Sequence, residues 1–245
     1  MMSCLSRLSR VRFVLSLLSV SLLGACSSSP ETPAAEAPVA TTAATGTPSA
    51  GAARPTAAAP PNILFFGNSL TAGLGVEPEE AFPALVGQKI DSAGLKYQVI
   101  NAGLSGETTA GGRSRVGWVL SRQPVAVFVL ELGGNDGLRG LPLSDTRRNL
   151  QAIIDTVRRR SPATKIVLAG MQIPPNLGQV YAADFKQLYA ETARKNQLVL
   201  IPFLLEGVGG VRELNQPDQI HPTPAGHRRI ARTVWQVLRP VVREQ

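Results

Sequence analysis

From Pro61 onwards, short apolar runs alternate with longer stretches in which apolar and polar residues recur with the period of a helix. The apolar runs are continuous and rich in Val, Ile, Leu and Phe, which is typical of strands buried on both faces. We expect strands at residues 63–66, 97–101, 125–132, 165–171 and 198–201. We expect helices at residues 81–93, 113–122, 144–160, 180–196 and 224–242. Ser144 and Pro224 are helix start signals, and Pro162 is a stop signal.

The alternation of strands and helices predicts an α/β fold. About five parallel strands would form a central sheet with helices on both faces, which is a three-layer sandwich. Residues 61–245 are long enough for one hydrophobic core, and no internal repeat divides them. In such sheets, ligands bind at the carboxyl ends of the strands, so that loops far apart in sequence meet at one edge.

The first 25 residues have the pattern of an export signal. A basic start precedes an apolar run that is short for a membrane span, and small residues follow it. Residues 23–26, Leu-Gly-Ala-Cys, resemble the lipobox of bacterial lipoproteins. The resemblance implies that Cys26 is acylated and begins the mature protein, and Ser27 after it implies sorting to the outer membrane. The alternative is an incidental Cys26 beside an ordinary cleavage site.

The segment between this signal and the predicted domain has low complexity. Residues 27–60 are all Ala, Pro, Ser, Thr or Gly, except for Glu31, Glu36, Val39 and Arg54. Such a segment buries too little apolar surface to offset the entropy of ordering it. We therefore expect a lipoprotein signal peptide at residues 1–25, a lipidated, disordered tether at 26–60 and a folded domain at 61–245.

The composition excludes several classes of function. Of the 245 residues, 44% are hydrophobic and 17% are charged, as in ordinary globular proteins, and the formal net charge is +8. The basic residues are dispersed over predicted helices without an RNA-binding aromatic signature or zinc-finger spacing, so we expect no nucleic-acid partner. The charge is also compatible with a mild attraction to anionic lipid headgroups. Since the two cysteines are Cys4 and Cys26, we expect neither a disulfide nor a thiolate metal site in the mature domain.

Ser69 and His221 suggest nucleophilic catalysis. Ser69 closely follows the first apolar run, and His221 comes three residues after Asp218 in the loop before the last helix. A serine hydroxyl is a weak nucleophile until an imidazole accepts its proton, and a carboxylate then orients and stabilises that imidazole. A turn between Asp218 and His221 can place both side chains on the same side. Each residue alone also has a structural alternative: a turn for Ser69, and a cap or loop bridge for His221.

Acyl transfer also needs hydrogen-bond donors for the developing oxyanion. The candidates are the backbone N–H groups of Ser69 and Gly103 and the side-chain amide of Asn135, each near the end of a predicted strand. Glycine lets the backbone approach a substrate closely, and an amide donates without adding charge. A tight turn with an Asx hydrogen bond is the alternative for Asn135. We expect Asp136 to structure its loop, and His227 to be structural or exposed.

Four blocks in their order resemble the SGNH (GDSL) hydrolase family. They are Gly67-Asn68-Ser69-Leu70, Asn101-Ala102-Gly103, Gly133-Gly134-Asn135-Asp136 and Asp218-Gln219-Ile220-His221. The resemblance implies a flavodoxin-like three-layer sandwich and a catalytic triad of Ser69, His221 and Asp218. It also implies an oxyanion hole formed by Ser69, Gly103 and Asn135, and it implies no metal and no cofactor. Within the family, the chain is most similar to the bacterial thioesterase I, lysophospholipase and arylesterase group, a likeness supported by residues 106–112 and 169–175.

One position departs from the family pattern. The first block usually has an aspartate where this chain has Asn68. An amide both accepts and donates hydrogen bonds, whereas a carboxylate only accepts them. We therefore expect a local change in hydrogen bonding and in pH response, with the nucleophile intact.

The resemblance implies a serine esterase that hydrolyses carboxylic esters or thioesters with acyl chains through a covalent acyl-enzyme. The apolar segment at residues 171–180 either lines an acyl groove with Met171, Ile173 and Pro174, or only covers the sheet. Export disfavours cytosolic acyl-CoA as the substrate and favours lysophospholipids or other lipid esters at the periplasmic side of the membrane. The alternatives are an O-acetylesterase acting on carbohydrate or peptidoglycan, and a non-catalytic lipoprotein that binds envelope ligands.

Overall fold

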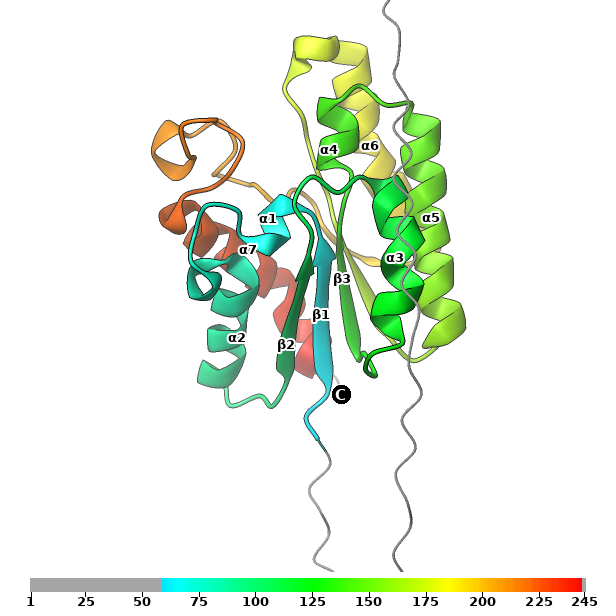
Figure 1. The fold of residues 1–245 in the computed structure, drawn as a ribbon, viewed down its shortest axis with the longest axis vertical. Coiled ribbons are helices and arrows are strands. Elements are labelled where there is room, and N and C mark those ends of the chain that lie inside the picture. Colours follow the sequence, from blue (N-terminus) through cyan, green and yellow to red (C-terminus); the bar gives the residue numbers. More distant parts are fainter. Residues whose placement is uncertain (1–58, 244–245) are drawn as a thin grey trace, which may run out of the picture. The chain divides into compact units, whose positions relative to one another are not determined.

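The apolar runs form a five-stranded parallel sheet in the computed structural model, which describes residues 59–243 (Figure 1). The strands are β1 (Asn62–Gly67), β2 (Gln98–Gly103), β3 (Val127–Glu131), β4 (Lys165–Ala169) and β5 (Val199–Ile201). Their order across the sheet is β2-β1-β3-β4-β5, and each neighbouring pair is parallel. This is the flavodoxin-like order, in which the direction of winding reverses between β1 and β3.

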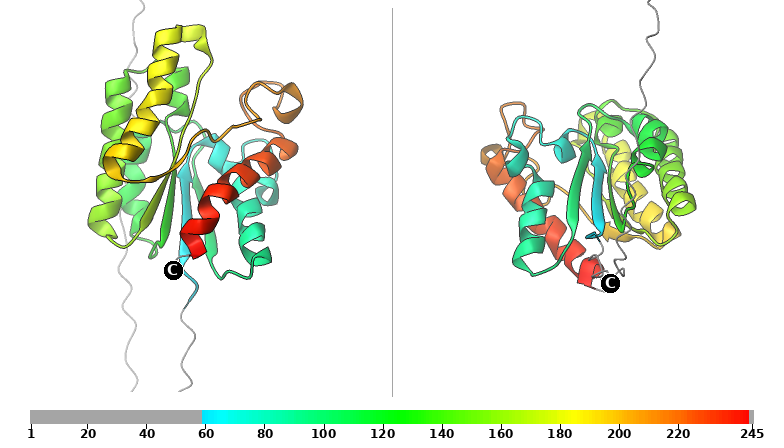
Figure 2. Two further views of the ribbon diagram at one scale, coloured as in Figure 1. Left: turned by 180° about the vertical axis from the view of Figure 1, so that it is seen from behind. Right: turned by 60° about the horizontal axis from the view of Figure 1, so that its bottom comes forward.

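Helices lie on both faces of the sheet. They are α1 (Ser69–Ala72), α2 (Phe82–Ser92), α3 (Thr109–Leu120), α4 (Gly134–Leu138), α5 (Leu143–Arg160), α6 (Gln179–Asn196) and α7 (Pro224–Arg243). Helices α2 and α7 pack together on one face, and α3, α5 and α6 cover the other (Figures 1 and 2). The three-layer α/β sandwich is therefore confirmed, whereas the short helices α1 and α4 were not predicted.

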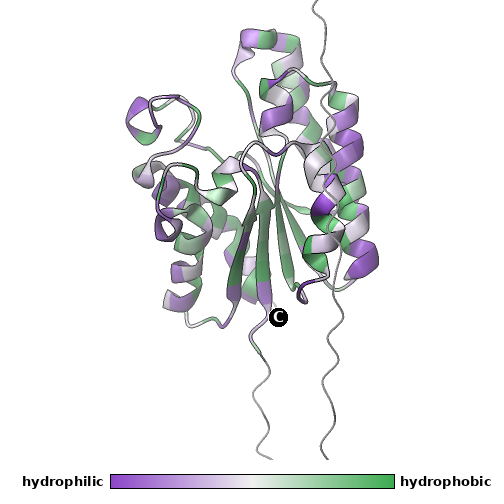
Figure 3. Ribbon diagram, in the orientation of Figure 1, coloured by the Kyte–Doolittle hydropathy of each residue, from purple (hydrophilic) through white to green (hydrophobic). Residues whose placement is uncertain are grey.

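Burial follows the position of each strand in the sheet. Every residue of β1 and β3 is buried, and so is all of β4 except Lys165. The edge strands differ, since β2 has no buried residue and β5 has only Ile201. The prediction of strands buried on both faces was thus right for the central strands and wrong for the edge strands β2 and β5, because the helices cover an edge strand less completely. Figure 3 shows the apolar strands at the centre and polar residues on the outer sides of the helices.

Two helix starts differ from the prediction. Helix α3 begins at Thr109 rather than at residue 113, because the Thr108 side chain accepts a hydrogen bond from the backbone N–H of Gly111 and caps the helix. Helix α5 begins at Leu143, and Ser144 lies inside its first turn instead of capping it. The earlier start of α3 places Thr109 near the carboxyl edge of the sheet.

The strand register brings three loops to one level of the sheet. Gly67 at the end of β1 pairs with Gly103 on one side and with Glu131 on the other. The segments that follow β1, β2 and β3 therefore leave the sheet side by side. They carry Ser69 and Asn135 and begin at the level of Gly103, so the topology alone gathers these candidates at one edge.

The part of the chain that the structure describes contains no helix with the length and apolar character needed to cross a membrane. The predicted signal peptide, Cys26 and almost all of the predicted tether lie outside the described residues.

Candidate active site

Ser69 is the first residue of α1, just beyond the carboxyl end of β1. Asn68 caps this helix, because its side chain accepts a hydrogen bond from the backbone N–H of Leu70 over 2.9 Å. Gly73, with a φ of 79°, ends the helix after one turn in the left-handed conformation that suits glycine. The backbone N–H of Ser69 thus stands in the first turn of a helix, where N–H groups have no acceptor within the helix.

The structure brings Ser69, His221 and Asp218 together. The Oγ atom of Ser69 lies 2.9 Å from Nε2 of His221, and Nδ1 of His221 lies 2.6 Å from Oδ2 of Asp218. When the neutral imidazole carries its proton on Nδ1, this nitrogen donates to the carboxylate and Nε2 accepts from the serine hydroxyl. The contacts therefore match those of a nucleophile, a base and an orienting acid.

The turn from Asp218 to His221 joins their two side chains. The backbone N–H groups of Ile220 and His221 donate to Oδ1 of Asp218 over 2.9 and 3.0 Å. Gln219 between them has a φ of 62°, a left-handed conformation that costs a residue other than glycine about 1 kcal/mol. The hydrogen bonds from the backbone and side chain of His221 lower the pKa of Asp218 to about 2. Asp218 is therefore ionised throughout the neutral range.

Two of the predicted oxyanion donors already have partners. The Asn135 amide donates to the carbonyl of Glu107 over 2.9 Å, which leaves a second N–H on the same nitrogen, and Asn135 lines the pocket described below. The backbone N–H of Gly103 donates to the side chain of Asn101, also over 2.9 Å. A Cβ atom at Gly103 would lie 2.2 Å from the backbone nitrogen of Ala72, so only glycine lets β2 approach α1 this closely.

An ion pair with a buried carboxylate links α3 to the segment that joins β2 to α3. The guanidinium of Arg115 lies 2.5 Å from the carboxylate of Glu107, whose side chain is only 3% exposed. The same guanidinium donates to the carbonyl of Ala102 over 2.8 Å and lies 4.0 Å from the centroid of the Phe66 ring. Because Asn135 donates to the carbonyl of Glu107, this pair fixes the loop that holds the Asn135 amide.

Asp136 does not contact His221. Its carboxylate accepts hydrogen bonds from the hydroxyl of Thr109 and, over 2.9 Å, from the backbone N–H of Thr109. It also accepts a bond from the hydroxyl of Thr146 over 3.4 Å. Asp136 thus connects α4 to α3 and α5, which agrees with the predicted role in structuring the loop.

His227 lies in α7 and is only 1% exposed. Its Nδ1 atom accepts a hydrogen bond from the backbone N–H of Phe82 over 3.2 Å, and its ring stacks against the Phe82 ring. Its Nε2 atom is buried without a hydrogen-bond partner. Burial lowers the pKa of His227 to about 4. Of the two predicted alternatives, the structural role is right and exposure is wrong.

A buried carboxylate close to Ser69 was not predicted. Glu131 ends β3, is fully buried, and accepts hydrogen bonds from the backbone and side chain of Asn68 and from the hydroxyl of Thr71. Burial raises the pKa of Glu131 to about 7, although these hydrogen bonds act in the opposite direction. The available signal was a single acidic residue inside the otherwise apolar run at residues 125–132.

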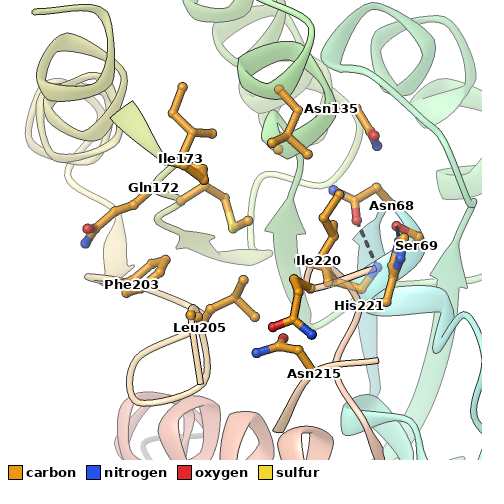
Figure 4. A pocket seen from close by; sticks show the side chains of 18 residues that line it. Asn68, Ser69, Asn135, Gln172, Ile173, Phe203, Leu205, Asn215, Ile220 and His221 are labelled. Atoms are coloured by element: carbon orange, nitrogen blue, oxygen red, sulfur yellow. Dashed lines mark hydrogen bonds between the residues drawn. The ribbon is translucent and has the colours of Figure 1, made fainter. Parts of the chain in front are cut away.

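A pocket of about 400 Å³ opens beside Ser69 (Figure 4). Asn68, Ser69, His221 and Asn135 lie on one side of it in this view, and Ile173, Gln172, Phe203 and Leu205 lie on the other. The three residues predicted for an acyl groove, Met171, Ile173 and Pro174, all line the pocket. The loop after β5 also lines the pocket, through Phe203, Leu205, Gly209 and Gly210, and this contribution was not predicted. The glycines of this loop were the available signal.

A model of the GDSL-like lipase/acylhydrolase family matches residues 65–229. The chain belongs to this family. Esterase TesA of Pseudomonas aeruginosa is 38% identical over 185 residues, which cover 76% of this chain and 91% of that protein. Thioesterase 1/protease 1/lysophospholipase L1 of Escherichia coli K12 is 33% identical over 186 residues, covering 76% and 87% of the two chains.

Solved structures of family members have the same fold. The crystal structure of TesA matches with a TM-score of 0.71 and 38% identity, covering 74% of this chain and 99% of that chain. The esterase EstA from Pseudoalteromonas sp., inhibited by monoethylphosphonate, matches with a TM-score of 0.70 and 28% identity, covering 74% and 98%. As a member of the GDSL family with such relatives, the chain is a hydrolase that acts on ester bonds.

Proposed function

We propose that this GDSL hydrolase is a serine esterase in which Ser69 is the nucleophile, His221 the general base and Asp218 the residue that orients the base. The observation that carries the proposal is the continuous chain of contacts from Ser69 Oγ to His221 over 2.9 Å and from His221 to Asp218 over 2.6 Å. Hydrogen-bond reach between nucleophile and base is the first geometric requirement for this chemistry. The ionised carboxylate then stabilises the imidazolium that forms when the proton moves.

Turnover would proceed in two halves through an acyl-enzyme. The Ser69 oxygen attacks the ester carbonyl while its proton passes to Nε2 of His221, and the tetrahedral intermediate carries the negative charge on the former carbonyl oxygen. When the intermediate collapses, His221 returns this proton to the leaving alkoxide or thiolate. A water molecule then attacks the acyl-serine with His221 again as base, and collapse releases the carboxylic acid and restores the Ser69 hydroxyl.

For the oxyanion, we propose the backbone N–H groups of Ser69 and Gly103 together with the second N–H of the Asn135 side chain. The N–H of Ser69 lies in the first turn of α1, and the second N–H of Asn135 is not used in its bond to the carbonyl of Glu107. The N–H of Gly103 faces the oxygen of Asn101 in this structure and has to turn towards the substrate or be shared with it. Donors held in place by α1 and by the Glu107 loop need no reorganisation when the charge develops.

We propose esters and thioesters with acyl chains as the substrate class, of the lysophospholipase, arylesterase or thioesterase type. Apolar side chains of Met171, Ile173, Phe203 and Leu205 line the pocket beside Ser69, which suits a hydrocarbon chain. Apolar side chains are also exposed on segments at the same carboxyl edge of the sheet. They include Leu104, Leu138, Leu177 and Ile220. Such exposure is suited to a substrate presented at a lipid surface.

The location of the enzyme is a proposal from sequence. We propose that residues 1–25 are a lipoprotein signal peptide and that Cys26 carries a lipid anchor. The Ala/Pro/Thr-rich residues to position 60 then tether the hydrolase domain to the periplasmic side of the envelope, where membrane lipid esters are present and cytosolic acyl-CoA is not.

A chain-length series tests the activity and the substrate class together. Purified protein is assayed with p-nitrophenyl esters from acetate to palmitate, with Ser69→Ala as the control, and is labelled with a fluorophosphonate probe. We expect labelling at Ser69 and hydrolysis of esters with longer acyl chains. Hydrolysis of acetate alone would favour an O-acetylesterase, and the absence of labelling in folded protein would favour a non-catalytic binding protein.

A further inference from the structure

Glu131 holds the nucleophile turn on both sides of Ser69. Its carboxylate accepts bonds of 3.1 and 2.8 Å from the backbone N–H and side-chain amide of Asn68, which precedes Ser69. It also accepts a bond of 2.8 Å from the hydroxyl of Thr71, in the single turn of helix that begins with Ser69. A side chain of β3 therefore connects the start and the body of α1 to the centre of the sheet.

The cluster around Glu131 has no free space. Asn68 is 2% exposed, and Thr71 and Glu131 are 0% exposed. A Cβ atom at Gly67 would lie 2.1 Å from the hydroxyl oxygen of Thr71 and 2.5 Å from the carboxylate of Glu131. If a substitution creates a mismatch in hydrogen bonding or charge here, these side chains and the backbone of the turn therefore have to move.

Asn68 is matched to this carboxylate through both ends of its amide. The amide oxygen accepts from the N–H of Leu70, and the amide nitrogen donates to Glu131. A carboxylate at position 68 would still accept from Leu70, but it would donate to Glu131 only when protonated. Two carboxylates at hydrogen-bonding distance repel each other when both are ionised, so one of them retains a proton to higher pH.

We propose that Asn68 and Glu131 form a matched amide–carboxylate pair that positions Ser69, and that the neutral amide keeps the nucleophile turn intact when Glu131 is charged. The proposal rests on the esterase function proposed above. Both residues act through the turn that carries Ser69. Asn68 borders the pocket but is only 2% exposed, and its amide is bonded to Leu70 and Glu131. They are therefore positioning residues.

The pair is sensitive to pH in a defined direction. Because the folded-state pKa of Glu131 is about 7 and the ordinary value is 4.5, the folded protein retains a proton that the unfolded chain loses, and this group makes stability fall as the pH rises between these values. The other ionisable side chains around the cluster come from neighbouring elements. They are Tyr189 of α6, Asp136 of α4, Arg115 of α3 and His221 of the loop before α7. In the described structure, the hydrogen bonds to the Glu131 carboxylate come from Asn68 and Thr71.

The test exchanges the amide and the carboxylate. Wild type, N68D, E131Q and the double variant N68D/E131Q are compared by kcat for one p-nitrophenyl ester between about pH 6 and pH 9. In the double variant, the new amide at position 131 donates to the new carboxylate at 68, and its oxygen accepts from the backbone of residue 68 and from Thr71. N176D is the matched control, because it makes the same chemical change at an exposed asparagine.

We expect N68D to lose about tenfold or more in kcat at about pH 9, and less at about pH 6, where one proton is shared. We expect E131Q to lose activity throughout the pH range, because its new N–H₂ group is itself a donor and faces the donor groups of Asn68 and Thr71. The kcat of the double variant, relative to wild type, should exceed the product of the relative kcat values of the two single variants by about threefold to 100-fold. N176D should keep the wild-type profile.

The proposal is overturned if the double variant does no better than that product, or if N68D keeps a wild-type pH profile. If N68D fails to fold, the kcat of the double variant is compared with that of E131Q. A higher kcat in the double variant supports the pair, and an equal or lower kcat overturns it. The melting temperatures of the same proteins, measured as a function of pH, detect the interaction between residues 68 and 131 without any substrate. An inactive wild type would therefore count against the esterase, while the unfolding data still decide whether the pair exists.

Discussion

Ser69 and His221 are 152 positions apart in sequence, yet Oγ of the serine lies 2.9 Å from Nε2 of the histidine. Ser69 begins the helix that follows β1, and His221 reaches it from the loop before α7. Strands β2 to β5 and their helices are formed by the intervening chain, so the contact exists only after the whole sheet has assembled. The candidate catalytic centre is therefore a product of the complete domain.

Replacing either member of this pair should abolish turnover. We expect Ser69→Ala and His221→Ala each to lower kcat by roughly 10⁴- to 10⁶-fold, because nucleophile and base act as one unit. Melting temperatures should stay close to the wild-type value. Ser144→Ala is the matched control, since Ser144 is exposed on α5 and does not line the pocket beside Ser69. Substantial residual turnover in Ser69→Ala would assign the nucleophile elsewhere.

Asn135→Ala should reduce kcat by about 100- to 1000-fold with little change in the Michaelis constant, because the lost N–H serves the transition state. Steady-state kinetics with one ester measures both constants. Asn176→Ala, at an exposed position, should leave both unchanged. An increase in the Michaelis constant alone would contradict the oxyanion assignment.

Ile173→Ala should change the preference for acyl chains. Removing part of the pocket wall should lower kcat/KM for a long-chain ester by about tenfold and leave that for the acetate ester nearly unchanged. Val180→Ala is the matched control, because Val180 is 76% exposed at the end of the same segment and does not line the pocket. Equal losses for both esters would argue against an acyl groove at Ile173.

His227 should make the domain sensitive to acid. Its pKa is about 4 in the folded protein and 6.5 in the unfolded chain, so the unfolded chain gains a proton first and stability falls as the pH drops through this interval. The loss should approach about 3 kcal/mol. His227→Asn keeps an acceptor near the N–H of Phe82 but does not titrate. Denaturant unfolding at several pH values measures the free energy of unfolding of both proteins, and Glu131 contributes equally to both. The variant should lose less stability than the wild type as the pH falls. Parallel plots of this free energy against pH would exclude His227 as the cause.

Cys26→Ser should release the protein from the membrane. We expect the wild-type protein in the membrane fraction and the variant in the soluble fraction, because a serine hydroxyl does not replace the thiol as the site of lipid attachment. Immunoblots of fractionated cells measure this distribution. Continued retention of the variant would contradict the proposed anchor.

Much of the fold could be predicted because its signals are local. The five apolar runs and the helical stretches between them have the periods of buried strands and amphipathic helices, and each was found near its expected position. The burial of β2 was predicted wrongly, because β2 lies at the edge of the sheet and its position in the sheet is not encoded in its own residues. The start of α3 depended on a single cap at Thr108.

The sequence by itself determined the order of the elements, the candidate residues at the strand ends and the apolar character of the segment around Ile173. Tertiary structure decided which side chains meet. Glu131 became the partner of Asn68 because the register places the end of β3 beside the end of β1. Arg115 meets Glu107, only eight positions before it, and the same guanidinium bonds to the carbonyl of Ala102. A hydrophobic period in the sequence predicts neither contact, because hydrogen bonds and ion pairs between side chains depend on packing geometry rather than on local conformational preference.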